Sequence, residues 1–196
     1  MEIDYKKYRW FETRSGKIVV GGKSASQNDE LLKLLKSKQK ELIVMHTSTP
    51  GSPFSIILSD INKVSKSDLE ESAIFTGCFS RAWRERKFSA EIHIFKLSQL
   101  SKSSLMKLGT WGITGKPEKA KVSLELVLTK QKSILRAVPE KTAEKKDILL
   151  KICPGKIDKV DMLPKLSMEL KDKFSQEEIL SALPSGGVSI CKSHKF

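Results

Sequence analysis

The feature that most constrains the fold of this chain is a change in hydrophobic period near residue 88. From residue 88 to 94, and again from 122 to 128, apolar side chains occupy every second position. A period of two is typical of a β-strand that buries one face. In two stretches before residue 88, apolar residues instead recur at helical spacing. The sequence therefore predicts a chain that contains both amphipathic helices and half-buried strands.

The order of the expected elements indicates the fold class. Helices are expected over residues 28–38, with Asn28 as N-cap, and from the capping box Ser67–Glu70 to about residue 84. The order β, α, β, β, α and then a run of β favours an α+β fold over a doubly wound parallel sheet. We expect a mixed, largely antiparallel sheet with helices on one face. The expected strands cover residues 17–20, 42–45, 54–58, 88–94, 110–114 and 122–128.

The end of the chain is expected to form a small α/β extension. Residues 138–146 are polar and turn-like and are interpreted as a linker. A strand, two short helices and a last strand are expected after it, over residues 148–152, 160–170, 175–183 and 188–191. We therefore divide the chain into a main domain, 1–138, and an extension, 139–196, that docks on it.

The net charge of +13 indicates a polyanionic partner. Lys and Arg number 36 against 23 Asp and Glu, and residues 61–139 alone carry a net charge of +8. This concentration in the middle of the chain favours a basic patch rather than a basic tail. The alternative is a surface whose lysines only keep the protein soluble, because net charge determines association and not fold.

Composition also predicts the compartment. No apolar stretch approaches the roughly 20 residues that span a bilayer, and the N-terminus does not resemble a secretory signal. The three cysteines, Cys78, Cys153 and Cys191, are far apart and form no CxxC pair. This spacing argues against both a disulfide framework and a zinc site. We expect a cytoplasmic protein in a reducing compartment, without contact with a membrane.

Few residues are suited to catalysis. His46 is the most interesting of the three histidines, because it ends an expected strand and begins a loop rich in Pro and Gly. His93 is expected on a polar strand face, His194 in a fraying tail, and Cys78 in the core. The stretch Gly109–Lys116 is not a P-loop, since its spacing is one residue too long and Pro117 replaces the Ser or Thr that would hold magnesium. We expect no metal, no cofactor and no enzymatic activity.

Basic and aromatic residues are interleaved in three stretches, which are Tyr8–Phe11, Arg81–Lys87 and Lys102–Lys116. Lys and Arg can neutralise phosphates while flat rings stack on exposed bases, as single-stranded RNA recognition requires. The alternative is that Trp10, Trp83 and Trp111 are core residues, since tryptophan is commonly buried.

Six short stretches, in order, resemble the RNA-binding domain of the NFACT proteins (NFACT-R). They are Tyr8-Arg-Trp-Phe-Glu-Thr13, Val19-Val-Gly-Gly-Lys23 with Gln27-Asn-Asp29, His46 with its loop to Gly51, Cys78-Phe-Ser-Arg-Ala-Trp83, Leu100-Ser-Lys102 and Gly109-Thr-Trp-Gly-Ile-Thr-Gly-Lys116. The resemblance covers roughly residues 5–130. In larger proteins this domain accompanies ribosome quality control factors of the NEMF and bacterial fibronectin-binding-like type. The chain resembles the stand-alone, archaeal-type form.

The chain departs from the family pattern at three positions. Ser48 and Pro50 stand where the family usually has an acidic residue and a second His, so the resemblance does not extend to a His/Asp/His cluster. Lys23 stands where Arg is frequent, which keeps the charge but loses the bidentate fork.

Together these features predict a non-enzymatic module that binds tRNA or rRNA, in connection with the large ribosomal subunit or translation quality control. Phosphate contacts are expected from Arg9, Lys23, Arg81, Arg84, Lys102 and Lys116, and hydrogen bonds from Gln27, Asn28 and His46. Gly21 and Gly22 permit positive φ and let the backbone approach RNA closely. One alternative is an RNA-processing or RNA-modifying enzyme with His46, Ser48 and Lys102 as its site. Another is an interaction subunit of a split NFACT assembly. The sequence does not indicate the oligomeric state.

Overall fold

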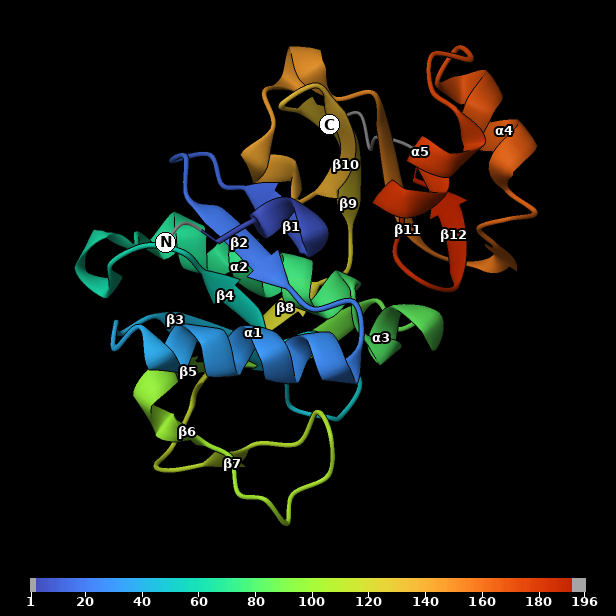
Figure 1. Ribbon diagram of the computed structural model, residues 1–196. Helices are drawn as coiled ribbons and strands as arrows, with labels where there is room; N and C mark the ends of the chain where they lie inside the picture. Colours follow the sequence, from blue (N-terminus) through green and yellow to red (C-terminus); the bar gives the residue numbers. More distant parts are fainter. Residues whose placement is uncertain (1–2, 192–196) are drawn as a thin grey trace.

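The computed structural model describes residues 3–191, and its centre is a six-stranded sheet in which every pair of neighbours is antiparallel (Figure 1). The order of strands across it is β1-β2-β4-β3-β5-β8. Their bounds are Arg9–Glu12 for β1, Ile18–Gly21 for β2, Ile43–Thr47 for β3, Ser55–Ile57 for β4, Ser89–Lys96 for β5 and Glu118–Ser123 for β8. Two further strands, β6 (Leu100–Ser101) and β7 (Gly112–Ile113), form a separate small hairpin.

Helices cover both faces of this sheet. Helix α1 (Ala25–Ser37) packs Leu31, Leu32 and Leu35 in one core cluster with Trp10 of β1. Helix α2 (Lys66–Cys78) packs Phe75 in a second cluster with residues of the other face, including Phe11 and Met45. The α+β class is confirmed, but the expectation of helices on one face is wrong. Because consecutive residues are buried in β2, β3 and β4, both faces of the sheet need a cover.

The helix boundaries differ from those predicted. Helix α1 starts four residues early, because Ser24 rather than Asn28 is the N-cap and accepts from the Gln27 N–H at 3.2 Å. Helix α2 starts from a capping box between Ser65 and Asp68. It ends at Cys78, and Ser80 then caps a separate short helix, α3 (Arg81–Arg84). The prediction of a single helix up to residue 84 is therefore wrong, because the Ser80 hydroxyl accepts from the Ala82 N–H and caps a new helix.

The strand expected over 122–128 is two strands in different sheets. Strand β8 ends at Ser123, and β9 (Leu126–Gln131) begins a four-stranded sheet of order β10-β9-β11-β12. The alternation continues through the break because Leu124, Leu126 and Leu128 are all buried in one cluster. The other strands of this sheet are β10 (Ile134–Val138), β11 (Leu150–Asp158) and β12 (Gly187–Ile190). Phe88, expected to be buried, is 74% exposed and lies just before β5.

Two short helices, α4 (Leu163–Glu169) and α5 (Gln176–Ala182), pack on the second sheet. Their cluster includes Trp83 of α3, so the end of the chain shares a core with the main part. The second sheet takes two strands from before residue 139 and two from after it. A division into domains near residue 138 stays a prediction. His194 and the last few residues lie outside the described part.

The cysteine expectation needs correction. Cys153 and Cys191 form a disulfide, with their Cα atoms 6.0 Å apart, while Cys78 is buried and unpaired. The separation of 38 residues is no obstacle, because β11 and β12 are antiparallel neighbours and bring the two positions together. Cys78 behaves as predicted for a core residue, since burial raises the pKa of its thiol well above the ordinary value. Within residues 3–191, no helix is long and apolar enough to cross a membrane.

Candidate nucleic-acid interface

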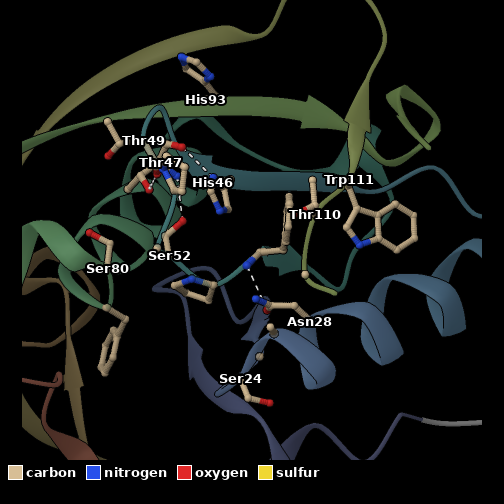
Figure 2. Close-up of a pocket in the computed structure, with 18 of the residues that line it drawn as sticks. Ser24, Asn28, His46, Thr47, Thr49, Ser52, Ser80, His93, Thr110 and Trp111 are labelled. Carbon is tan, nitrogen blue, oxygen red and sulfur yellow. Dashed lines mark hydrogen bonds between the residues drawn. The ribbon is translucent and has the colours of Figure 1, made fainter. Parts of the chain in front are cut away.

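A cleft of about 590 Å³ opens between the start of α1, the loop from β3 to β4, and the segment that leads into β7 (Figure 2). Its floor is formed by the ends of β3 and β5, which carry His46 and His93. Most of the predicted RNA-binding residues line this cleft or lie next to it. The lining also includes Thr47, Thr49, Ser52, Ser80 and Thr110, whose hydroxyls make much of its surface polar.

The loop from β3 to β4 is held by its own side chains. The Thr47 hydroxyl donates to the Thr49 carbonyl at 2.6 Å, and the Ser52 hydroxyl accepts from the Thr47 N–H at 3.0 Å. Gly51 has φ +109°, a conformation that L residues rarely adopt. Its carbonyl accepts from the Arg81 N–H at 2.7 Å, so the loop is also tied to the start of α3. These contacts fix the wall that faces α1.

The opposite wall depends on Gly22 and Asn28. Gly21 and Gly22 both lie outside the positive-φ region, so the expectation of a left-handed turn there is wrong. Gly22 is required for close approach instead, since a Cβ at this position would lie 2.7 Å from the Asn28 nitrogen. The buried Asn28 side chain accepts from the Phe54 N–H at 3.2 Å and joins α1 to the loop. Asn28 therefore shapes the cleft, with its side-chain oxygen engaged by the protein.

Lys102 and Trp111 organise the third wall. The Lys102 ammonium lies 2.9 Å from the Asp29 carboxylate and donates to the carbonyls of Lys107 and Thr110. Asp29 also accepts from the Trp111 indole at 2.8 Å and from the Gly109 N–H at 3.1 Å. Burial opposes the ionised form of Asp29, but these hydrogen bonds outweigh it and lower its pKa. All three protons of Lys102 are thus used to position the loop that borders the cleft.

His46 is neutral at pH 7 and presents one nitrogen to the cleft. Burial lowers its pKa, although the Thr47 carbonyl, 2.7 Å from Nδ1, acts in the opposite direction. This carbonyl fixes the tautomer with the proton on Nδ1, because a carbonyl can only accept. The ring stacks on Phe54 with centroids 4.5 Å apart. No described residue hydrogen-bonds to Nε2, which is left as an acceptor.

Sequence reasoning missed His93. The local pattern places it only on a polar strand face, but the register of β3 and β5 makes it the direct cross-strand partner of His46. Its Nε2 lies 3.1 Å from the Glu91 carboxylate, which also pairs with Lys119. The strand register that joins the two histidines depends on pairing between residues 47 positions apart, and no local pattern could have indicated it.

Three cations line the cleft without a carboxylate partner in the described part of the chain: Arg9, Lys23 and Arg84. Arg9 is partly buried and its guanidinium lies over the Phe79 ring, 5.2 Å from the centroid. Burial lowers the pKa of both Arg9 and Lys23. The side chain of Arg81 lies beside Gly51 at the rim. These unpaired charges are available to an anionic ligand.

The remaining predicted residues are more peripheral. Gln27 accepts from the Lys23 N–H at 2.8 Å and supports the backbone next to the cleft. Lys116 is exposed and borders a different groove, together with Gln99 and Glu118. The structure therefore does not bring Lys116 to the other predicted site residues. Ser48 and Pro50, in the loop from β3 to β4, both line the cleft.

The three tryptophans are core residues. Their side chains are buried, and the Trp83 indole donates to the Gly187 carbonyl at 2.9 Å. The interpretation in which these rings stack on RNA bases is therefore wrong, and the alternative of core tryptophans holds. Large apolar side chains are instead exposed at the cleft edge, where Leu108 is 65% and Ile113 is 49% exposed. Over residues 3–191, no group of three or more His, Cys, Asp or Glu could hold a metal ion.

The fold and the cleft define an α+β domain with a cationic, hydroxyl-rich binding site. A family model described as the NFACT protein RNA binding domain matches residues 7–115, more than half of the chain. The chain belongs to this family, which confirms the resemblance found in the sequence.

Known relatives agree with this assignment. The chain is 31% identical over 201 residues to the archaeal Rqc2 homolog aRqcH of Methanocaldococcus jannaschii, across 96% of this chain and 29% of that protein. It therefore spans less than a third of that relative's length. A similar fold occurs in the C-terminal part of the fibronectin/fibrinogen-binding protein from Streptococcus suis. The TM-score is 0.52, with 21% identity over 59% of this chain and 44% of that chain.

Proposed function

We propose that this chain binds structured RNA, tRNA or rRNA, through the cleft, and that it does so at the large ribosomal subunit in translation quality control. One observation carries the proposal: Arg9, Lys23 and Arg84 face one cleft without carboxylate partners in residues 3–191. Cations that are held together and unpaired are suited to phosphates, which supply most of the affinity in nucleic-acid binding.

The remainder of the cleft suits the sugar and the bases. Hydroxyls of Thr47, Thr49 and Ser52, and the acceptor Nε2 of His46, can exchange hydrogen bonds with ribose 2′-hydroxyls, which distinguish RNA from DNA. The name of the archaeal relative, an Rqc2 homolog, supports a role in ribosome quality control. The cytoplasm is the proposed location.

The test is a binding titration with tRNA, an rRNA fragment and a DNA duplex of the same length. We compare the parent protein with the double variant Lys23→Gln/Arg84→Gln, which removes two exposed cleft charges. The control is Lys165→Gln/Lys173→Gln, which removes two exposed charges elsewhere. The proposal expects RNA to bind more tightly than DNA and the cleft variant to lose about tenfold or more, since each charged contact contributes about 1.5 kcal/mol. Equal losses in both variants would contradict it.

A second candidate is chemistry on RNA, and the pairing of His46 with His93 is the observation that favours it. Two imidazoles in one cleft can act as acid and base. Both rings, however, are engaged through one nitrogen, His46 by the Thr47 carbonyl and His93 by Glu91. The same titrations, followed by analysis of the RNA for cleavage or modification, separate binding from turnover.

A further inference from the structure

The second sheet lies against the free edge of β1, next to the cleft (Figure 1). The Gln131 amide of β9 accepts from the Glu12 N–H at 2.8 Å and donates to the Glu12 carbonyl at 2.7 Å. Lys132 adds an ion pair to the Glu12 carboxylate at 3.0 Å. These contacts place strand β10 beside β1, although residues 131–138 lie beyond the stretch that matches the family model.

This arrangement stacks Arg136 of β10 on Trp10 of β1. The guanidinium lies 4.2 Å from the ring centroid, and its Nε is buried without a hydrogen-bond partner. A buried N–H of a charged group that lacks an acceptor is costly. Burial lowers the pKa of Arg136, consistent with a charge held partly away from water. The aromatic plane fixes the guanidinium in orientation, as phosphate recognition requires.

Electrostatic contacts link Arg136 to three further cations, directly to Lys23 and through Lys23 and Arg9 to Lys159. Besides burial, the charges of Arg136 and Arg9 lower the pKa of Lys23, and the charge of Arg9 lowers the pKa of Lys159. Lys159 follows β11 and donates to the Leu180 carbonyl at 3.0 Å. The Asp158 carboxylate raises the pKa of Lys159 and accepts from the Val160 N–H. Lys23 is thus repelled by Arg136 and Arg9, and Lys159 by Arg9, and none of the four cations has an ion-pair partner among residues 3–191.

We propose that Arg9, Lys23, Arg136 and Lys159 form a binding site for one phosphate group of the bound RNA, built jointly by β1 and the second sheet. Arg9 on Phe79 and Arg136 on Trp10 supply two oriented guanidinium forks. Lys23 and Lys159 supply ammonium groups. A bound phosphate relieves the repulsion that Lys23 and Lys159 receive from the two guanidinium groups. The C-terminal strands are then part of the RNA site rather than a separate appendage.

The identification with RNA rests on the proposed function, whereas anion binding itself is tested without RNA. Inorganic phosphate is the probe, and the thermal midpoint is measured in sodium phosphate and in sodium chloride of equal ionic strength. A ligand that binds only the folded state raises the midpoint. We expect phosphate to stabilise the parent protein specifically, and the variant Arg136→Gln/Lys159→Gln to lose most of this shift. Lys165→Gln/Lys173→Gln should keep it.

For each variant, the thermal midpoint in phosphate is compared with the midpoint of the same variant in chloride. The difference therefore measures phosphate binding even when a variant is less stable than the parent. Lys23→Gln is a second test, because Lys23 is exposed and its replacement disturbs no packing. It should also reduce the phosphate shift. A shift that is equal in all these variants would overturn the proposal, as would stabilisation by chloride as strong as that by phosphate.

RNA titrations distinguish this inference from the proposed function. We expect Arg136→Gln/Lys159→Gln to weaken RNA binding about tenfold and to reduce the salt dependence by about one phosphate contact. If RNA binds but this variant equals the control, the inference is wrong and the proposed function stands. If phosphate binds specifically but no RNA does, the anion site stands and the proposed function is wrong.

Discussion

Asp68 is a fully buried carboxylate that joins the turn between β1 and β2 to the start of α2. Burial alone would raise its pKa, but hydrogen bonds from Ser15, Thr13 and Ser65 outweigh this effect and hold the pKa at about 2. The hydroxyls of Thr13 and Ser15 each donate at 2.6 Å. The folded-state pKa lies below the unfolded value near 3.8, so Asp68 stabilises the fold above that pH and ceases to do so as pH falls towards 2.

We therefore expect Asp68→Asn to lower the free energy of unfolding by about 2 kcal/mol at pH 7, from the size of this pKa shift. The difference from the parent should shrink as the pH is lowered from 4 to 2. Urea unfolding at several pH values measures it, with the exposed Asp161→Asn as control. A loss that is independent of pH would contradict the assignment.

His46 makes a second prediction at this scale. Because its folded-state pKa is below the usual 6.5, the neutral ring contributes stability that is complete above pH 6.5 and is lost as the pH falls below it. The parent should therefore lose stability relative to His46→Gln between pH 7.5 and 5.5. His46→Ala should weaken RNA binding about threefold to tenfold, as expected for one neutral hydrogen bond. Any RNA turnover by the parent that disappears in His46→Ala would contradict a binding role.

At the scale of elements, Gln131 connects the two sheets. Its side-chain amide makes both hydrogen bonds to the Glu12 backbone that a neighbouring strand would otherwise make, at a partly buried position. Gln131→Ala leaves two backbone groups unpaired and should lower the free energy of unfolding by about 1–3 kcal/mol. Gln99 is the matched control, because it makes the same two kinds of bond, to Lys96 and Thr114, in an exposed place. Chemical denaturation of Gln131→Ala and Gln99→Ala compares them, and equal losses would contradict this role.

Elements with a strong local pattern could be predicted from the sequence, and those defined by pairing could not. Strands β2, β3 and β5 and the helices α1, α4 and α5 lie near their expected positions. The break between β8 and β9 escaped prediction, because the alternation of Leu124, Leu126 and Leu128 continues while the chain changes sheets. The break between α2 and α3 has a local cause, because the Ser80 hydroxyl caps the start of α3. It was not predicted because the apolar stripe continues across Ser80.

The same division applies to the site. Local sequence and resemblance predict Lys23, Arg84 and His46 as site residues, and all three line the cleft. Their role in RNA binding stays a prediction. From the sequence, Lys102 is predicted to contact a phosphate, but in the fold it pairs with Asp29. Because Asp29 is 73 positions away, the sequence alone could not indicate this pair. One local feature could have pointed to Arg136 as a site residue, because it is the single charged residue in the apolar strand Ile134–Val138.

At the scale of the whole molecule, part of the cationic charge is neutralised within the fold. Lys102 pairs with Asp29, Lys87 pairs with Glu85 at 2.7 Å, and Lys151 lies between Glu125 and Glu140. Arg9, Lys23 and Arg84 line the cleft without an ion pair among residues 3–191, and Arg136 lies over Trp10 at the edge of β1. We therefore attribute RNA affinity to a site and not to total charge.

The salt dependence of RNA affinity tests this claim most directly. Log affinity is measured against log salt concentration for the parent, Lys23→Gln/Arg84→Gln and Lys165→Gln/Lys173→Gln, all by the same titration. Each phosphate contact that is lost should reduce the slope by about 1, so the slope of the cleft variant should fall by about 1–2, because Lys23 shares its phosphate with other cations. The control should keep the slope of the parent. Equal slopes for the two variants would contradict the claim, because the charge would then act diffusely.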